Sequence, residues 1–157
     1  MRVPKMYKVL EQAKVMWEAN SDLINFCQIE GSLRSNNLRH TTTIGSSLVT
    51  KANYHASKET KPLIRAIKKH ANEASWLQTY STSEVGEDFS NRHCYFELIG
   101  RKGHFYAEKM RVFICYWGEY LNYKWHSHEA EEMYYILGGK ARFRTKTMKK
   151  ILKAGDT

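Results

Sequence analysis

Two imidazoles, a carboxylate and a phenol lie within nine residues of the 157-residue chain, between His126 and Tyr134. Side chains two residues apart in a β-strand share a face and lie roughly 7 Å apart, so His126 and His128 can approach one ion from the same side. Glu132 and Tyr134 form a second such pair after a short bend. Imidazole with carboxylate suits Zn, Fe, Mn, Ni or Co. The spacing predicts a divalent metal ion held by His126, His128 and Glu132; the alternative is a pair of solvated histidines at a strand end.

Tyr134 lies in phase with the predicted ligands, so its phenol is expected on the same side as the bound ion. A tyrosine with its ordinary pKa of about 10 is a poor base at neutral pH. A cation close to the phenol stabilises the phenolate, as bound metals do for water and thiols. The alternative for Tyr134 is a ring packed in the core. Glu129 and Glu131 are out of phase with the ligands, so we expect them to face solvent.

The elements before this motif are predicted to be helical. Residues 4–75 contain two stretches with apolar side chains at three- and four-residue steps, which is typical of amphipathic helices. Thr60, Lys61 and Pro62 look like the start of the second helix, because proline is tolerated in the first turn. Between the two stretches, Ser21 and Asp22 are candidate caps for a short helix that ends before Gly31. Residues 36–58 are predicted to be a loop with some helical turns. The apolar positions are Met6, Val9, Leu10, Ala13 and Trp17 in the first stretch and Leu63, Ile67, Ala71 and Ala74 in the second.

After Trp76 the apolar period changes to that of strands. Many short strands separated by glycine turns favour a small antiparallel barrel or sandwich. We therefore predict a helical region over residues 1–75 and a β-barrel domain over residues 76–157. In the last strand, basic and less polar residues alternate, which predicts one solvated basic face. The predicted strands cover residues 94–99, 111–117, 120–125, 133–137 and 140–147.

The composition limits the partners and the location. The formal net charge is +9, but the basic residues are spread along the chain and no nucleic-acid-binding motif accompanies them. A solvated face, or attraction of an anionic substrate, therefore accounts for the charge better than nucleic acid does. The sequence contains no run of 18 or more apolar residues, so no membrane span is predicted. The N-terminus lacks the apolar run of a signal peptide. Cys27, Cys94 and Cys115 are an odd number without a C-x-x-C pair, so free thiols and a cytoplasmic location are expected.

The pattern His126-x-His128-x-x-x-Glu132, followed by Gly139, resembles the first conserved motif of the cupin superfamily. A closer resemblance, over about residues 62–157, is to the cupin-type dimethylsulfoniopropionate lyases. Ala130 and Tyr134 separate that family from a generic cupin. The closer resemblance is carried by Tyr116, Trp117, Gly118, Tyr123, His126, His128, Glu129, Ala130, Glu131, Glu132, Tyr134 and Tyr135, with residues 92–100 and 103–105 upstream.

This resemblance implies a mainly β fold, with a cupin-like antiparallel β-barrel preceded by a helical region. It also implies a carbon–sulfur lyase that cleaves dimethylsulfoniopropionate, a zwitterionic sulfonium carboxylate, to dimethyl sulfide and acrylate on a bound divalent metal. Tyr134 would be the base and Tyr123 a second catalytic tyrosine. Strict alternation puts Tyr123 on the face opposite His126, so its role rests on the resemblance alone. Trp117, Trp125 and Tyr116 are candidates for a sulfonium pocket by cation–π attraction, or else core residues.

The chain ends 25 residues after Glu132, before the position where cupins supply a further histidine ligand. A fragment or a truncated product is therefore expected, with an incomplete barrel and at most three protein ligands. His93 and His104 have no spacing that recommends them as substitutes. Small cupins often pair, which makes a homodimer possible. Two alternatives to the lyase stay open: another cupin metalloenzyme, such as an oxygenase or isomerase of a small carboxylate, and a non-catalytic cupin-like binding module.

Overall fold

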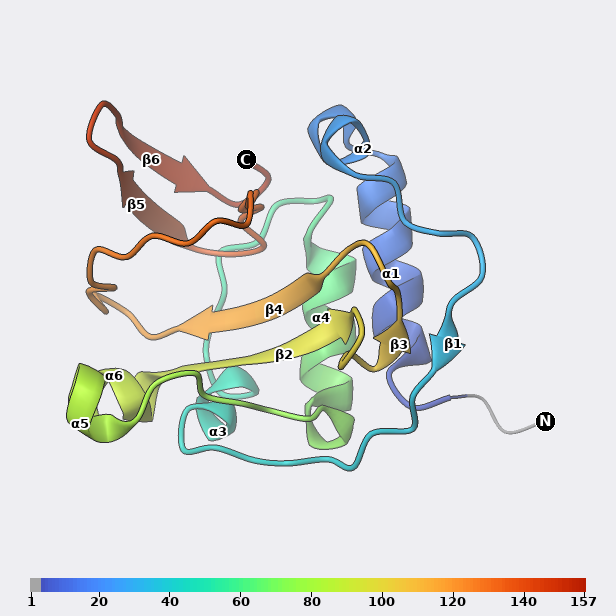
Figure 1. The fold of residues 1–157 in the computed structure, drawn as a ribbon, viewed down its shortest axis with the longest axis horizontal. Coiled ribbons are helices and arrows are strands. Elements are labelled where there is room, and N and C mark those ends of the chain that lie inside the picture. The colour runs from blue at the N-terminus through green and yellow to red at the C-terminus, as the bar shows by residue number, and fades with distance from the viewer. Residues whose placement is uncertain (1–3) are drawn as a thin grey trace.

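The computed structural model describes residues 4–157, with most of its helices before its strands (Figure 1). The helices are α1 (Tyr7–Glu18), α2 (Ser21–Phe26), α3 (Ser46–Val49), α4 (Lys61–His70), the 3-10 turn η1 (Ala71–Glu73), α5 (Thr82–Val85) and α6 (Glu87–Arg92). The strands are β1 (Arg34–Ser35), β2 (His93–Ile99), β3 (Phe105–Tyr106), β4 (Val112–Trp117), β5 (Lys140–Arg144) and β6 (Lys149–Lys153).

The longest pairing of the main sheet joins two antiparallel strands, β2 and the edge strand β4. β2 pairs with β4 from His93 opposite Trp117 to Ile99 opposite Val112, with one irregularity between Glu97 and Ile99. The four-stranded sheet has the order β1-β3-β2-β4, and β5 and β6 form a separate antiparallel hairpin. Within residues 4–157 the two sheets do not close into a barrel.

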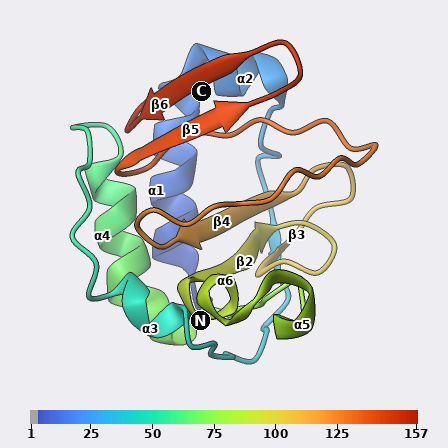
Figure 2. The ribbon, with the colours of Figure 1, turned by 90° about the vertical axis from the view of Figure 1, so that its left-hand side faces the viewer.

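Helices α1 and α4 lie side by side on one face of the main sheet (Figures 1 and 2). The predicted apolar stripes are confirmed, because Val9 and Leu10 of α1 and Leu63 of α4 are buried. These side chains belong to the same buried cluster as Phe96 and Leu98 of β2. The layer of two helices therefore covers the face of β2 and fixes the sheet against the N-terminal half of the chain.

Several local predictions need correction. The cap of α2 is Asn20, whose side-chain oxygen accepts a hydrogen bond from the Leu23 amide at 3.0 Å, rather than Ser21 or Asp22, which already lie inside the helix. Helices α5 and α6 lie in the region predicted to be β-structure. Strand β1, conversely, lies within the predicted helical region. The division of the chain at residue 75 stays a prediction.

Residues 120–125 and 133–137 were predicted to be strands, and this prediction is wrong. The segment 118–139 runs as an irregular loop beside β4, joining it to β5 (Figure 1). Tyr120 has a φ of 58°, in the left-handed region, which interrupts an extended run. The Gly118 amide donates to the Arg92 carbonyl at 2.8 Å, and the Gly139 amide donates to the His55 carbonyl at 3.0 Å. The loop is therefore fastened at both ends to other parts of the chain, with no ladder between them.

No helix among the residues described is long and apolar enough to cross a membrane.

Strand β5 alternates as predicted, with Lys140, Arg142 and Arg144 exposed and Ala141 and Phe143 half-buried.

The burial of β2 makes a prediction about stability. The Phe96 side chain is fully buried, with its ring centroid 4.9 Å from that of Trp76 in an edge-to-face contact. We expect Phe96→Ala to lower the free energy of unfolding by about 3–5 kcal/mol, since it leaves a cavity in the core. Phe113→Ala on β4, where the side chain is 37% exposed, is the matched control and should cost less than about 2 kcal/mol. Urea unfolding of both variants measures this, and equal losses would contradict the assignment of the core.

Candidate metal and catalytic site

The predicted site residues all lie on the loop between β4 and β5. His126, His128 and Glu132 are exposed, whereas Tyr123 and Tyr134 are half-buried. Strand alternation therefore does not decide where these side chains point. Each of these side chains is instead oriented by its own hydrogen bonds and ring contacts.

Backbone carbonyls orient the two histidines. Nδ1 of His126 lies 3.0 Å from the Lys124 carbonyl oxygen, and Nδ1 of His128 lies 2.9 Å from the Ala130 carbonyl oxygen. A carbonyl oxygen only accepts, so each Nδ1 must carry the hydrogen. The lone pair of each neutral ring is then on Nε2, the arrangement that metal-binding histidines commonly use. The two ring centroids lie 6.0 Å apart.

The carboxylate of Glu132 connects a histidine to the candidate base. Oε1 of Glu132 lies 3.1 Å from Nε2 of His128, and Oε2 accepts a hydrogen bond from the Tyr134 hydroxyl at 3.0 Å. With Nδ1 of His128 already donating, Nε2 and Oε1 are two acceptors that face each other. Two acceptors at this distance need a cation between them, either a proton or a metal ion. The nitrogen and oxygen donors suit a divalent transition metal.

The third predicted ligand, His126, is less closely associated with the other two, His128 and Glu132. Among residues 4–157, no group of three or more His, Cys, Asp or Glu side chains is gathered tightly enough to form a ready ligand cluster. The structure joins His128 to Glu132 directly and places His126 beside His128. The donor set therefore fits a metal in its chemistry, with His126 as the outer member.

Tyr134 is a neutral phenol in this arrangement. Its ring centroid lies 5.0 Å from that of Phe143 and 6.3 Å from that of Trp117. Burial raises the pKa of Tyr134, and the neighbouring Glu132 carboxylate raises it further. The chain alone therefore holds the proton on this phenol, and a nearby positive charge is needed before Tyr134 can act as a base.

Tyr123 lies on the same side as His126, contrary to the alternation prediction. Their ring centroids are 4.4 Å apart, because the segment is a loop and the two side chains fold toward each other. The hydroxyl of Tyr123 lies 3.3 Å from that of Tyr80. Burial and this hydrogen bond both raise the pKa of Tyr123.

The three aromatic residues considered for a sulfonium pocket, Trp117, Trp125 and Tyr116, do not form one cluster in the structure. Trp117 lies with its ring centroid 6.3 Å from those of both Tyr123 and Tyr134, and its buried indole nitrogen has no hydrogen-bond partner within residues 4–157. Trp125 is 65% exposed. Tyr116 packs edge-to-face on Tyr54 instead, at 6.4 Å. Only Trp117 lies against both candidate tyrosines.

Two residues near the site were missed by the sequence analysis, Tyr80 and Phe89. The ring of Phe89, on α6, has its centroid 5.4 Å from that of Tyr123, and Tyr80 precedes α5. The signal for this region was present, since Ser81 and Glu84 form a capping box, a recognisable helix start. The stretch was instead assigned to the β region, so its rings were not considered.

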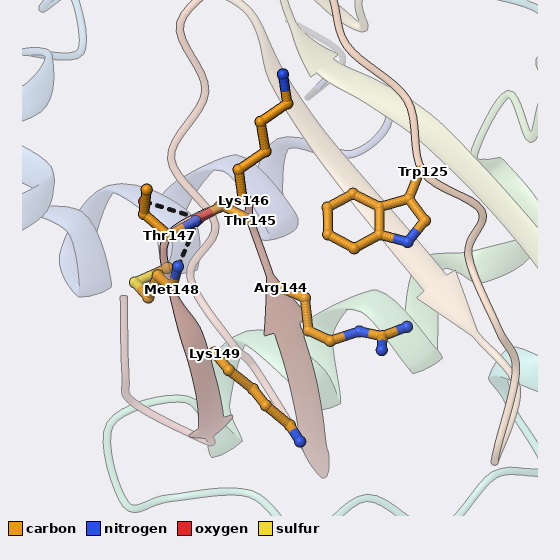
Figure 3. A pocket seen from close by; sticks show the side chains of 7 residues that line it. All are labelled: Trp125, Arg144, Thr145, Lys146, Thr147, Met148 and Lys149. Atoms are coloured by element: carbon orange, nitrogen blue, oxygen red, sulfur yellow. Dashed lines mark hydrogen bonds between the residues drawn. The ribbon is translucent and has the colours of Figure 1, made fainter.

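A hollow lies between Trp125 and the β5–β6 hairpin (Figure 3). It has a volume of about 320 Å³, and Figure 3 shows the Arg144 side chain running beneath the Trp125 ring. The guanidinium carbon lies 5.6 Å from the ring centroid, within cation–π range. Lys146 and Lys149 also line this hollow. The hairpin side of the loop over residues 118–139, which we call the motif loop, is therefore positively charged.

The other two histidines of the β region are buried in the protein. His104 accepts a hydrogen bond from the Ser75 amide at 3.0 Å through Nε2. His93 stacks on Tyr123, with ring centroids 6.1 Å apart. Burial lowers the pKa of each to about 4. Both are neutral at neutral pH, and His104 is a buried residue of the core.

Comparison with known proteins identifies the family of the chain. A family profile described as dimethylsulfoniopropionate lyase matches residues 32–156. The chain belongs to the dimethylsulfoniopropionate lyase family. The curated dimethylsulfoniopropionate lyase DddQ of Ruegeria pomeroyi is 40% identical over 70 residues, which are 45% of this chain and 35% of that protein. The alignment thus spans about a third of the length of that relative.

Two solved structures resemble the whole fold. A crystal structure reported for the DMSP lyases RdDddP and RnDddQII is 33% identical, with a TM-score of 0.93 over 97% of this chain and 78% of that chain. The crystal structure of DMSP lyase DddQ from Ruegeria pomeroyi is 25% identical, with a TM-score of 0.91 over 99% of this chain and 79% of that chain. These matches confirm the predicted cupin-like fold with a helical region before it.

The buried His104 makes a prediction about acid stability. Its pKa is about 4 in the folded chain and near the ordinary 6.5 when unfolded, so below pH 6.5 the unfolded state binds more protons. The contribution of His104 is therefore fully present above pH 6.5 and is lost as the pH falls toward 4. We expect the free energy of unfolding to drop by about 1–2 kcal/mol between pH 7 and pH 5 through this group.

Urea unfolding at pH 7 and pH 5 measures the effect. His104→Gln, whose amide oxygen can still accept from Ser75, should lose this part of the pH dependence. The exposed His40→Gln is the control and should keep it. An unchanged pH dependence in His104→Gln would contradict the assignment.

Proposed function

We propose that this chain is a metal-dependent carbon–sulfur lyase that cleaves dimethylsulfoniopropionate to dimethyl sulfide and acrylate by β-elimination. Membership of the family supports this substrate. The observation that carries the mechanism is the Glu132 carboxylate, which faces His128 Nε2 with one oxygen and accepts from the Tyr134 hydroxyl with the other. A ligand pair and a candidate base are thus joined through one side chain.

His126, His128 and Glu132 are the proposed ligands of a divalent metal ion, Zn, Fe, Mn, Ni or Co. A bound ion of this kind would supply a Lewis acid for the substrate carboxylate and a positive charge beside the phenol of Tyr134. The carbonyl bonds to both Nδ1 atoms hold the imidazoles as Nε2 donors. The exposure of the three side chains leaves them accessible to substrate.

Tyr134 is the proposed base. As phenolate it takes the proton from the carbon next to the substrate carboxylate. The electron pair of that C–H bond becomes the new C=C bond as the C–S bond breaks, and the pair of the C–S bond leaves on sulfur. The sulfonium thereby departs as neutral dimethyl sulfide, which makes it a good leaving group. The Tyr134 hydroxyl then returns its proton to solvent.

Tyr123 is the second proposed catalytic tyrosine. Its ring lies against His126 and its hydroxyl is hydrogen-bonded to that of Tyr80. When Tyr80 is the donor of that bond, the Tyr123 hydroxyl can donate to a bound carboxylate. The ring of Trp117 lies near both tyrosines and shields them from water on the β4 side. Tyr123 therefore orients the substrate while Tyr134 removes the proton.

A cytoplasmic location, a homodimer and the division into residues 1–75 and 76–157 complete the proposal. β4 is the last strand of its sheet and β5 and β6 form a separate hairpin, so both have edges that could pair with another chain.

The role of Tyr134 is tested by Tyr134→Phe. We expect dimethyl sulfide release, measured by headspace gas chromatography with dimethylsulfoniopropionate, to fall by about 100-fold or more, as general-base removal typically does. Metal content should stay unchanged, because the phenol is not a proposed ligand. Full activity in this variant would contradict the base assignment, and metal binding without any gas from the unaltered chain would contradict the proposed reaction.

The ligand assignment is tested separately by metal content. His128→Ala and Glu132→Gln should each weaken metal affinity by more than about 100-fold, because even supporting residues of metal sites are worth 10–100-fold. Glu129→Gln is the matched control, since Glu129 is exposed beside the ligands and has no ligand role. Metal titration followed by elemental analysis measures this. Retained affinity in His128→Ala, or an equal loss in Glu129→Gln, would contradict the assignment.

A further inference from the structure

A small cavity lies between helices α5 and α6 and the part of the motif loop that carries Tyr123 and His126. Its volume is about 210 Å³, below the roughly 300–1,000 Å³ of pockets for drug-sized ligands, so it suits a small group. We call it the α5–α6 pocket, lined by Tyr80, Glu84, Phe89, Tyr123, Trp125 and His126 among others. Two of these residues belong to the candidate catalytic site, so the pocket is continuous with that site.

Three aromatic rings meet at this pocket. The ring centroids of Tyr80 and Phe89 lie 6.4 Å apart, those of Tyr80 and Tyr123 lie 6.4 Å apart, and those of Phe89 and Tyr123 lie 5.4 Å apart. The Tyr80–Tyr123 hydroxyl bond fixes the orientation of two of them. Aromatic faces attract alkylated cations, which lose little hydration when they enter such a site.

A fixed carboxylate lies at the same pocket. Glu84 accepts hydrogen bonds from the Ser81 amide at 2.8 Å and the Ser81 hydroxyl at 2.7 Å, which hold it in one position and lower its pKa. Lys124 also lines the pocket, so the fixed charges at its wall balance. The preference for a cation therefore depends on the ring face of Tyr80 together with the placed carboxylate of Glu84.

We propose that the α5–α6 pocket binds the dimethylsulfonium end of the substrate through the ring face of Tyr80 and the carboxylate of Glu84, with Phe89 and Tyr123, whose rings pack on each other in a tilted arrangement, as the apolar wall. This rests on the proposed function for the identity of the cation. The substrate is a zwitterion, and its carboxylate then points past Tyr123 toward His126, His128 and Glu132. Of the three aromatic residues that the sequence analysis named for this role, Trp125 lines the pocket. Trp117 is not among the lining residues, and Tyr116 packs against Tyr54 instead.

The test uses a cation that has no carboxylate. Trimethylsulfonium is titrated into the full chain, binding is followed by NMR shifts of the aromatic rings, and tert-butyl alcohol serves as a neutral molecule of similar size. We expect trimethylsulfonium to bind at least about tenfold more tightly than the alcohol. Equal binding of the two would overturn the proposal, because the pocket would then be only an apolar hollow.

Variants locate the binding. Tyr80→Leu should weaken trimethylsulfonium binding about tenfold, whereas Tyr80→Phe, which keeps the ring, should retain it within about threefold. Glu84→Gln removes the charge but keeps the capping box, so it should weaken binding several-fold in a folded chain. Phe113→Leu, a ring lost outside the pocket on β4, is the control. Unchanged binding in both Tyr80→Leu and Glu84→Gln would overturn the proposal.

Activity measurements separate this proposal from the proposed function. If dimethyl sulfide is released and Tyr80→Leu raises the KM about tenfold with little change in kcat, both are supported. If Tyr80→Leu leaves the KM unchanged, the pocket assignment fails while the lyase stands. If trimethylsulfonium binding follows the variants and no dimethyl sulfide is released, the pocket stands and the substrate proposal fails.

Discussion

The antiparallel pairing of β2 with β4 is the constraint on which the rest of the structure depends. β2 is buried along nearly its whole length, because α1 and α4 cover one face and β3 and β4 flank its edges. Its register places Trp117, at the end of β4, opposite His93. Both rings then lie against Tyr123, so the start of the motif loop is set by a pairing that begins deep in the core. A shift of this register by one residue would turn Trp117 to the other face and remove that contact.

Beyond β4, local interactions replace the sheet. The motif loop has no ladder, so each functional side chain is placed by its own partner: a carbonyl for each histidine, a ring for each tyrosine, and His128 and Tyr134 for the two oxygens of Glu132. Such an arrangement holds donor atoms facing solvent, which a packed strand face would not. It also leaves an unpaired acceptor facing an acceptor at His128 and Glu132. A proton on His128 Nε2 or a bound metal ion satisfies this pair.

The sequence predicted the elements whose signals are local and repeated. The stripe through Val9, Leu10 and Ala13 predicted α1, and the apolar runs around Phe96 and Ile114 predicted β2 and β4. The strands expected at 120–125 and 133–137 failed because strand propensity is realised only where a partner strand is available, and a single sequence does not reveal partners. The same limit misplaced Tyr123, since alternation holds only within a strand. The grouping of His128, Glu132 and Tyr134 was predictable from spacing, whereas the approach of Tyr80 and Phe89 depends on contacts across more than thirty residues.

The two sides of Tyr123 differ in chemistry, and this difference decides how a zwitterion would lie. On one side are imidazole and carboxylate donors that suit a metal and, through it, an anion. On the other are the ring face of Tyr80 and the Glu84 carboxylate, which suit a cation without directional hydrogen bonds. A substrate with a carboxylate at one end and a sulfonium at the other satisfies both only in one orientation. In that orientation the carbon next to the carboxylate lies between the two sides, beside the tyrosines. Burial keeps the phenol of Tyr134 protonated in the absence of a cation, so the base would form only when the anion-binding side is charged. Binding and proton removal are thereby coupled in the proposed mechanism, because the same positive charge would serve both.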